Sequence, residues 1–180
     1  MASPITSNMG IPSCSVMVGG KDMGATYGIK SIVVTKEINK VSKARIIIMD
    51  GNPSDETFDA SASKDFDPDK VISIKMGYNQ KEQEVFSGVI TGHSLKVRFR
   101  SSELVLTCMD KAFQLATTRK TTNFVKKKDS DVISEIIGGY GLSKTVSATT
   151  FKHPNLVQYN CSDWDFLLAR ADANAMVVIN

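Results

Sequence analysis

The hydrophobic pattern of this chain changes its period near Lys111, and that change most constrains the fold. Before Lys111, apolar residues recur at every second position, as where Ile72, Ile74 and Met76 alternate with less apolar neighbours. A two-residue period is typical of a strand with one buried face. After Lys111, apolar residues recur at helical spacing. The sequence therefore predicts a β-rich α+β fold, with the β structure first.

Several strands are expected in the first part of the chain, each bounded by turn residues. The longest is interrupted near Gly92 and His93. Short connections between successive strands favour antiparallel pairing. We therefore expect residues 13–110 to form an antiparallel β-barrel. The expected strands are residues 13–18, 29–36, 44–50, 71–78, 84–100 and 102–110.

Two helices are expected after Lys111. Asp129 is a candidate cap for a helix over residues 130–138, which ends at a Gly-Gly pair. Ser162 begins a second helix over residues 163–173, with an acidic residue at the capping-box position. Trp164 and Leu168 are expected on the buried face of the second helix.

A last strand is expected over residues 176–179, next to the end of the sequence. It has no visible partner strand. We therefore expect the natural chain to continue beyond Asn180.

An acidic segment, residues 50–70, interrupts the strand pattern. The simplest interpretation is a solvated, mobile loop. A calcium loop is the alternative, because carboxylates alternate over residues 65–69. However, Lys70 and Met76 stand where an EF-hand loop needs glycine and glutamate.

Composition excludes several classes of protein. The chain has 180 residues, 42% of them hydrophobic, which is enough to bury a core without metals or disulfides. A net charge of +3 argues against a strongly basic nucleic-acid binder. Apolar runs are too short for a membrane span, and the N-terminus lacks the features of a signal peptide. We expect no stable membrane insertion.

Residues that could hold a metal or perform catalysis are sparse. Cys14, Cys108 and Cys161 are too far apart for a zinc motif, and their odd number argues against a disulfide framework. We interpret Cys108 as a buried thiol. The two histidines, His93 and His153, accompany no nucleophile motif. We therefore expect no cofactor and no enzyme activity, with a hydrolase that uses either histidine as an alternative.

The segment 96–128 is the strongest electrostatic feature, with nine basic residues and two acidic ones. Lys96, Arg98 and Arg100 alternate with apolar residues, which predicts a basic stripe on one strand face. A solvated face, an acidic protein partner and a nucleic acid are the possible interpretations. Aromatic residues are scattered, so base-stacking platforms are not evident. We favour a protein partner for these three residues and expect no nucleic acid.

Four segments, in order, resemble the VgrG and phage late-control D family, the hub of contractile injection systems. Phe86 and Gly88 resemble its F-x-G-x-I/V strand, and residues 104–108 the strand that follows. Residues 131–142 resemble its V-x-x-I-L-x-x-x-G-L helix. Residues 158–171 resemble its Q-Y-x-E-S-D-x-x-F-L-x-R segment, although Cys161 departs from it. Within that segment the fold-signature residues are Tyr159, Trp164, Phe166 and Leu167.

The resemblance implies a fold and a role. Family members form a homotrimeric hub from two related β-barrels per chain, with an outer α/β segment between them. On that template, residues 1–117 are the first barrel and residues 118–180 begin the outer segment. The implied function is to adapt a trimeric spike to a hexameric tail tube, as in a phage tail or a type VI secretion system.

The same resemblance implies partners and a place of assembly. The implied partners are the tail-tube protein, baseplate proteins and effectors. Assembly would occur in the bacterial cytoplasm, followed by secretion or incorporation into an injection particle.

Overall fold

A computed structural model describes residues 11–51, 57–79, 81–98 and 101–180. These residues fall into two compact units. The first unit comprises residues up to Thr35 together with Lys43–Met109, and the second comprises Lys36–Ser42 together with Asp110–Asn180. The predicted division of the hub at residues 117 and 118 stays a prediction.

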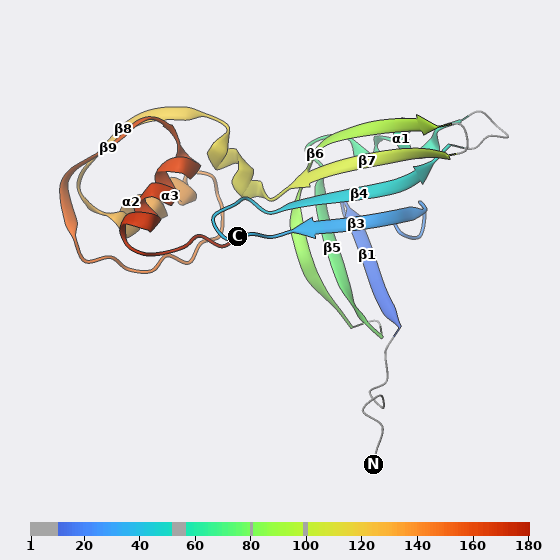
Figure 1. The fold of residues 1–180 in the computed structure, drawn as a ribbon, viewed down its shortest axis with the longest axis horizontal. Coiled ribbons are helices and arrows are strands. Elements are labelled where there is room, and N and C mark those ends of the chain that lie inside the picture. The colour runs from blue at the N-terminus through green and yellow to red at the C-terminus, as the bar shows by residue number, and fades with distance from the viewer. Residues whose placement is uncertain (1–10, 52–56, 80, 99–100) are drawn as a thin grey trace, which may run out of the picture. The chain divides into compact units, whose positions relative to one another are not determined.

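The first unit contains the strands predicted from the two-residue period (Figure 1). Its elements are β1 (Pro12–Val18), β2 (Lys21–Asp22), β3 (Ile29–Thr35), β4 (Lys43–Asp50), the short helices α1 (Asp59–Ala62) and η1 (Lys64–Phe66), β5 (Val71–Tyr78), β6 (Lys81–Arg98) and β7 (Ser101–Met109). All strand pairs are antiparallel, in the order β2-β1-β5-β6-β7-β4-β3. The antiparallel β-rich prediction is therefore confirmed.

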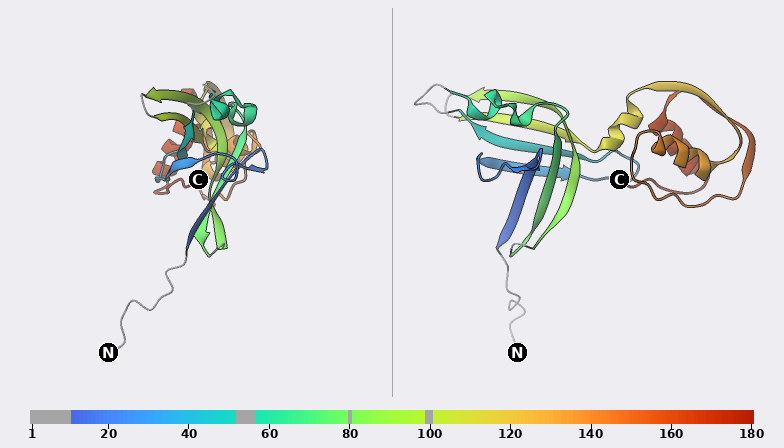
Figure 2. Two further views of the ribbon diagram at one scale, coloured as in Figure 1. Left: turned by 90° about the vertical axis from the view of Figure 1, so that its right-hand side faces the viewer. Right: turned by 180° about the vertical axis from the view of Figure 1, so that it is seen from behind.

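The long strand β6 joins two halves of this sheet. Its first half pairs with β5 and its second half with β7, with Val89 in both ladders. A register shift between Ile90 and Gly92 coincides with the predicted interruption. Figures 1 and 2 show the two halves running in different directions around the core of this unit.

A closed barrel is not confirmed. The strands at the ends of the order, β2 and β3, do not pair with each other within the described residues. One reason is the length of β2, which has two residues and therefore few backbone groups to pair with the seven-residue β3.

The inward faces of both halves bury one apolar core. Phe86, from the F-x-G segment, is 2% exposed. Gly88 lies so close to β7 that a Cβ atom would overlap the carbonyl of Met109, which is why this position needs glycine. The other large buried side chains of this core include Val16, Ile46, Ile48, Phe66, Ile72, Ile74, Ile90, Leu104 and Leu106.

The described part of the acidic segment contains two short helices and a buried phenylalanine, so the prediction of a solvated, mobile loop is wrong for that part. Phe66 enters the core, and the ring of Tyr27 packs edge-on against it. Asp50 accepts hydrogen bonds from the backbone N–H groups of Gly51, Ala60 and Ser61, which fixes the start of α1. Asp55 and Glu56 lie outside the described residues.

The second unit consists of a two-stranded ribbon and two helices. Its elements are η2 (Lys111–Ala116), β8 (Arg119–Lys128), α2 (Asp129–Gly138), β9 (Lys152–Ser162) and α3 (Asp163–Ala173). Figure 1 shows β8 and β9 curving around α2 and α3. The helix predictions are confirmed within a residue. The two strands of the ribbon were not predicted.

Two local predictions in this unit are wrong. Lys128, not Asp129, is the N-cap of α2, because β8 continues to that residue. Residues 176–179 form no strand. Instead, Val178 exchanges backbone and side-chain hydrogen bonds with Asn39, at 2.9 and 2.8 Å.

A separate apolar core fills the second unit. Trp164 is buried on α3, as predicted. Phe166 is also buried and stacks on Phe124 of β8. Leu168, which was expected to be buried, is half-buried against the same core. Val132 and Ile136 contribute the buried face of α2. No helix in the described residues is long and apolar enough to cross a membrane.

Candidate functional site

The predicted basic stripe lies at the end of the β6–β7 hairpin. Lys96 and Arg98 are exposed on β6, whereas Arg100 lies outside the described residues. Leu95 and Val97, on the opposite side of the strand, are also exposed. This end of β6 therefore presents basic side chains on one face and apolar side chains on the other.

Strand register brings more basic residues to the same face as Lys96. Residues paired across neighbouring strands share a face of a sheet. Lys96 pairs with Glu103, which pairs with Met49. On the same strand, β4, Arg45 has the same orientation as Met49, because the two are four residues apart in a regular strand.

We call this outer surface of β3, β4, β7 and the second half of β6 the basic face. Its exposed cations are Lys43, Arg45, Lys96 and Arg98. Lys43 and Arg45 were not predicted to belong to this face, because register between distant strands is not visible in the sequence.

One carboxylate lies within the basic face. Glu103 is 8% exposed and forms an ion pair with Lys30. The hydrogen bond from Lys30 holds the pKa of Glu103 below its ordinary value, and the charges of Arg98 and Lys96 act in the same direction. Glu103 is therefore already neutralised within the chain.

The Q-Y-x-E-S-D segment builds a polar network around Asp163. Gln158, which is 1% exposed, donates from Nε2 to Asp163 Oδ1 at 2.8 Å and to the carbonyl of Cys161 at 3.1 Å. Lys120 Nζ and the Tyr140 hydroxyl donate to Asp163 Oδ2 at 2.7 and 2.5 Å. The network thus joins β8, the end of α2 and the β9–α3 junction.

Burial alone would raise the pKa of Asp163. The hydrogen bonds from Lys120, Tyr140 and Gln158 outweigh burial and hold that pKa below its ordinary value. The same hydrogen bond from Lys120 to Asp163 raises the pKa of Lys120. Lys120, a member of the basic segment, therefore forms an ion pair with Asp163 within the same unit.

Tyr159 does not belong to the core, although we expected it to be a fold-signature residue. Its side chain is 78% exposed, because alternation along β9 turns it away from the helices while Gln158 turns toward them. Trp164, Phe166 and Leu167 are buried. Of the Gln-Tyr pair, it is Gln158 that is buried and hydrogen-bonds within the unit.

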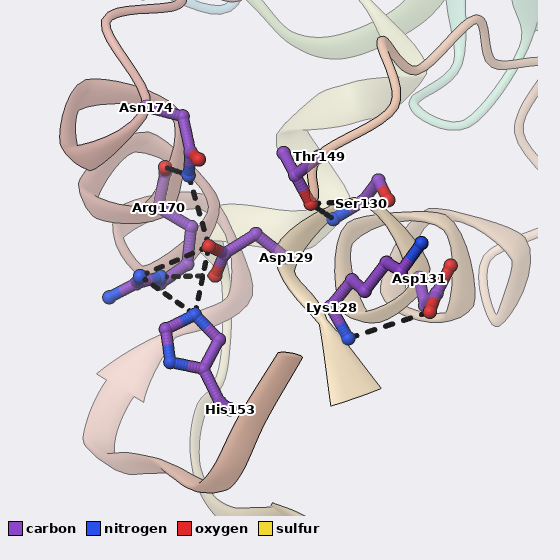
Figure 3. Close-up of polar contacts among 8 residues, drawn as sticks. All are labelled: Lys128, Asp129, Ser130, Asp131, Thr149, His153, Arg170 and Asn174. Carbon is purple, nitrogen blue, oxygen red and sulfur yellow. Dashed lines mark hydrogen bonds and ion pairs between the residues drawn. The ribbon is translucent and has the colours of Figure 1, made fainter. Parts of the chain in front are cut away.

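A second polar network surrounds Asp129 (Figure 3). Arg170 donates from Nε to Asp129 Oδ1 at 2.6 Å and from Nη2 to Oδ2 at 3.2 Å. His153 Nε2 and Asn174 Nδ2 each lie 3.0 Å from Asp129 Oδ2. The carboxylate of Asp129 is thus held by groups from β9 and from both the body and the end of α3.

The protonation of Asp129 decides which groups of this network donate hydrogen bonds. Burial would raise the pKa of Asp129, but hydrogen bonds from Arg170, Asn174 and His153 hold it far below its ordinary value. An ionised carboxylate only accepts, so His153 carries a hydrogen on Nε2 and donates it. Nη2 of Arg170 lies 3.4 Å from the same nitrogen and also points its hydrogens at Asp129.

The remaining candidate catalytic or metal-binding residues, His93 and the three cysteines, are described by their contacts and burial. His93 Nδ1 lies 3.2 Å from the carbonyl of Phe66 and links β6 to η1. In the part of the chain that the structure describes, neither histidine hydrogen-bonds to a serine or cysteine side chain. Cys108 is buried, and burial raises the pKa of its thiol to about 12. Cys14 is exposed and Cys161 half-buried, and all three thiols are free.

The calcium interpretation of the acidic segment gains no support. Within residues 11–51, 57–79, 81–98 and 101–180, no three His, Cys, Asp or Glu side chains gather in a way that could hold a metal ion. In the described part of that segment, Asp65 instead accepts a hydrogen bond from Tyr27 at 3.1 Å.

Several solved structures share this fold. The 43 kDa tail protein of prophage MuSo2 from Shewanella oneidensis matches with a TM-score of 0.73 and 11% identity, over 94% of this chain and 53% of that protein. A tail protein from Neisseria meningitidis MC58 matches with a TM-score of 0.63 and 14% identity, over 93% and 50%.

A third structure comes from a secretion system. The E. coli c3393 protein is a type VI secretion component with structural similarity to T4 bacteriophage tail proteins gp27 and gp5. It matches with a TM-score of 0.61 and 9% identity, over 84% of this chain and 41% of that protein. This chain therefore spans about half the length of these proteins. Their likeness confirms the β-rich α+β fold but not a closed barrel.

Sequence comparison identifies the family directly. No curated protein matches the sequence significantly. In contrast, the Alg8 N-terminal domain matches residues 8–180, which include nearly the whole of both units. The chain belongs to the family of the Alg8 N-terminal domain.

Proposed function

We propose that this chain is a structural part of the hub of a phage-tail-like or type VI contractile injection apparatus. The observation that carries the proposal is the shared fold. The tail and secretion proteins match over 84–94% of the chain, so the likeness includes the second unit as well as the sheet. A general β-sheet likeness would not extend to the helices and ribbon.

The more detailed proposal is that this chain forms the N-terminal part of a homotrimeric hub that adapts the spike to a hexameric tail tube. Its partners would be the tube protein, baseplate proteins and effectors, with assembly in the bacterial cytoplasm before secretion. The first unit supports association, because β3 and β2 end the strand order with backbone groups available for a neighbour. Ring formation is one way to cover such edges.

We also propose that the chain acts without catalysis. The titratable clusters around Asp129 and Asp163 support this interpretation. In both clusters the carboxylate is bound by side chains of the same unit, and each cluster ties helices to the ribbon. These contacts give the polar residues a structural role.

The test is to delete the gene in the producing bacterium and to complement it with the full-length protein. Electron microscopy of purified particles should show loss of assembled tubes after deletion and recovery after complementation. Mass spectrometry should find the chain in particles, and light scattering should give three copies per full-length assembly. Normal particles that lack the chain would contradict the structural role. A full-length chain that stays monomeric at tens of micromolar would contradict the trimer.

A further inference from the structure

The basic face has an apolar centre. Across β4, β7 and β6 one row of paired residues is Ile47, Val105 and Ser94. Val105 is 4% exposed, although it is not part of the main core cluster and its register places it on the outer face. Met49 and Val33, by contrast, are more than half exposed on this face. The apolar centre is therefore a largely buried floor at Ile47 and Val105, and the accessible apolar surface of this face comes from Met49 and Val33.

The rim of this face is cationic. Lys43, Arg45, Lys96 and Arg98 are exposed, and none of the four forms an ion pair within the described residues. The acid on this face, Glu103, is already paired with Lys30. The unbalanced charge of the described face is therefore positive.

We infer that the basic face docks against an acidic surface of a different protein. The inference rests on the proposed function, because a hub component is surrounded by other proteins. An apolar centre with a charged, solvated rim is the usual arrangement of a protein interface. The rim cations would set the rate of association with the acidic partner and the orientation in which it binds. Burial of the apolar centre would add to the free energy of binding.

The apolar centre favours a protein over a nucleic acid. Phosphate backbones need cations along their path, and unpaired bases need aromatic platforms. The centre offers aliphatic side chains instead, which a nucleic acid would leave in water.

A second copy of this chain is a weaker candidate than a different acidic protein. The first unit does carry Glu82 and Glu84 on the other half of its sheet. However, Ser15 donates to Glu82 at 2.5 Å and Ser73 donates to Glu84 at 2.6 Å. Lys75 also stands opposite Glu84 in the β5–β6 ladder. Each of these carboxylates therefore already accepts a hydrogen bond, and Lys75 places a positive charge opposite Glu84.

The experiment places a photo-crosslinking amino acid at Ser94, beside Val105, in the full-length protein within purified particles. The crosslinked peptide should come from another protein and be rich in Asp and Glu. The variant Arg45→Glu/Lys96→Glu should lower both crosslink yield and incorporation by roughly tenfold, which is about 1.4 kcal/mol. The variant Lys81→Glu/Lys152→Glu makes the same change in net charge elsewhere and should retain both within about twofold.

Circular dichroism melts test whether the variants fold. If Arg45→Glu/Lys96→Glu does not fold, the variant Arg45→Gln/Lys96→Gln takes its place. A crosslink to a second copy, to nucleic acid or to lipid would overturn the inference. So would normal incorporation of the folded face variant. In both cases the wild-type chain is still found in particles, so the proposed function stands. Absence of the wild-type chain from particles overturns both.

Discussion

Removing the guanidinium of Arg170 should destabilise the second unit through Asp129. The variant Arg170→Met keeps much of the aliphatic stem but leaves a carboxylate that is only 3% exposed without its main cation. Breaking one partner of a buried ion pair typically costs about 3–5 kcal/mol. His153 and Asn174 still donate to Asp129, so we expect the lower end, about 3 kcal/mol.

The assay is urea unfolding followed by the fluorescence of Trp164. This is the only tryptophan in the sequence, and it packs in the core of the second unit. The signal therefore reports this unit by itself. Arg119→Met, at an exposed arginine of β8, is the matched control and should change stability by less than about 0.5 kcal/mol.

The effect should depend on pH. In the folded wild type the pKa of Asp129 is depressed, so its contribution is present above the unfolded pKa, about 3.9, and is lost as pH falls toward the folded pKa. In Arg170→Met the carboxylate can protonate at a higher pH, which relieves the uncompensated charge. The difference between wild type and variant should therefore shrink from pH 7 to about pH 3.5.

Two results would refute this reasoning. One is a loss below about 1 kcal/mol at pH 7, which would mean that the ion pair does little beyond its packing. The other is a loss that stays constant with pH, which would assign the cost to packing of the stem. The double variant Arg170→Met/Asp129→Asn should recover part of the loss, because it removes the buried charge as well.

Three further predictions concern the core, the signature segment and the histidines. Gly88→Ala should lower the unfolding midpoint of the first unit in circular dichroism, because the added Cβ overlaps the backbone of β7; an unchanged midpoint would contradict the close approach. Trp164→Ala should cost about 3–5 kcal/mol in urea melts followed by circular dichroism, whereas Tyr159→Ala should cost less than about 0.5 kcal/mol. The variant His93→Gln/His153→Gln should still assemble into particles if it folds, and loss of assembly by a stably folded variant would indicate a role for the histidines beyond structure.

The strands of the first unit were predictable because burial there alternates residue by residue. In β4, for example, Ala44, Ile46 and Ile48 are buried and Arg45 is exposed, so the period is visible in the sequence. The two helices were predictable from their caps and their apolar faces. Ser162 accepts from the backbone N–H of Asp165 at 3.0 Å, as the capping box requires.

The ribbon of the second unit was not predictable, because its pattern is weak and broken. Only Phe124 is fully buried among the residues of β8. Lys127 Nζ lies 5.7 Å from the Phe124 ring centroid, on the same side, although a regular strand would separate residues three apart. Lys126 explains this, because its positive φ of 53° interrupts the alternation.

The candidate docking surface was half predictable. Alternation along β6 placed Lys96 and Arg98 on one face, and the structure finds both exposed. The contribution of Lys43 and Arg45 depends on the order β6-β7-β4, which pairs strands that are about fifty residues apart in sequence. Local periodicity carries no information about such pairing, so the apolar centre between the cations was also missed.

The two buried aspartates explain why the signature of the second unit is polar. Each binds groups from segments far apart in sequence: Lys120 and Gln158 meet at Asp163, and Arg170 and His153 meet at Asp129. A buried carboxylate that loses its partners is costly, so a shifted ribbon or helix register would be penalised at both sites. Apolar residues of similar size would tolerate such a shift more easily. We therefore interpret the polar signature as a feature that selects one arrangement of ribbon and helices.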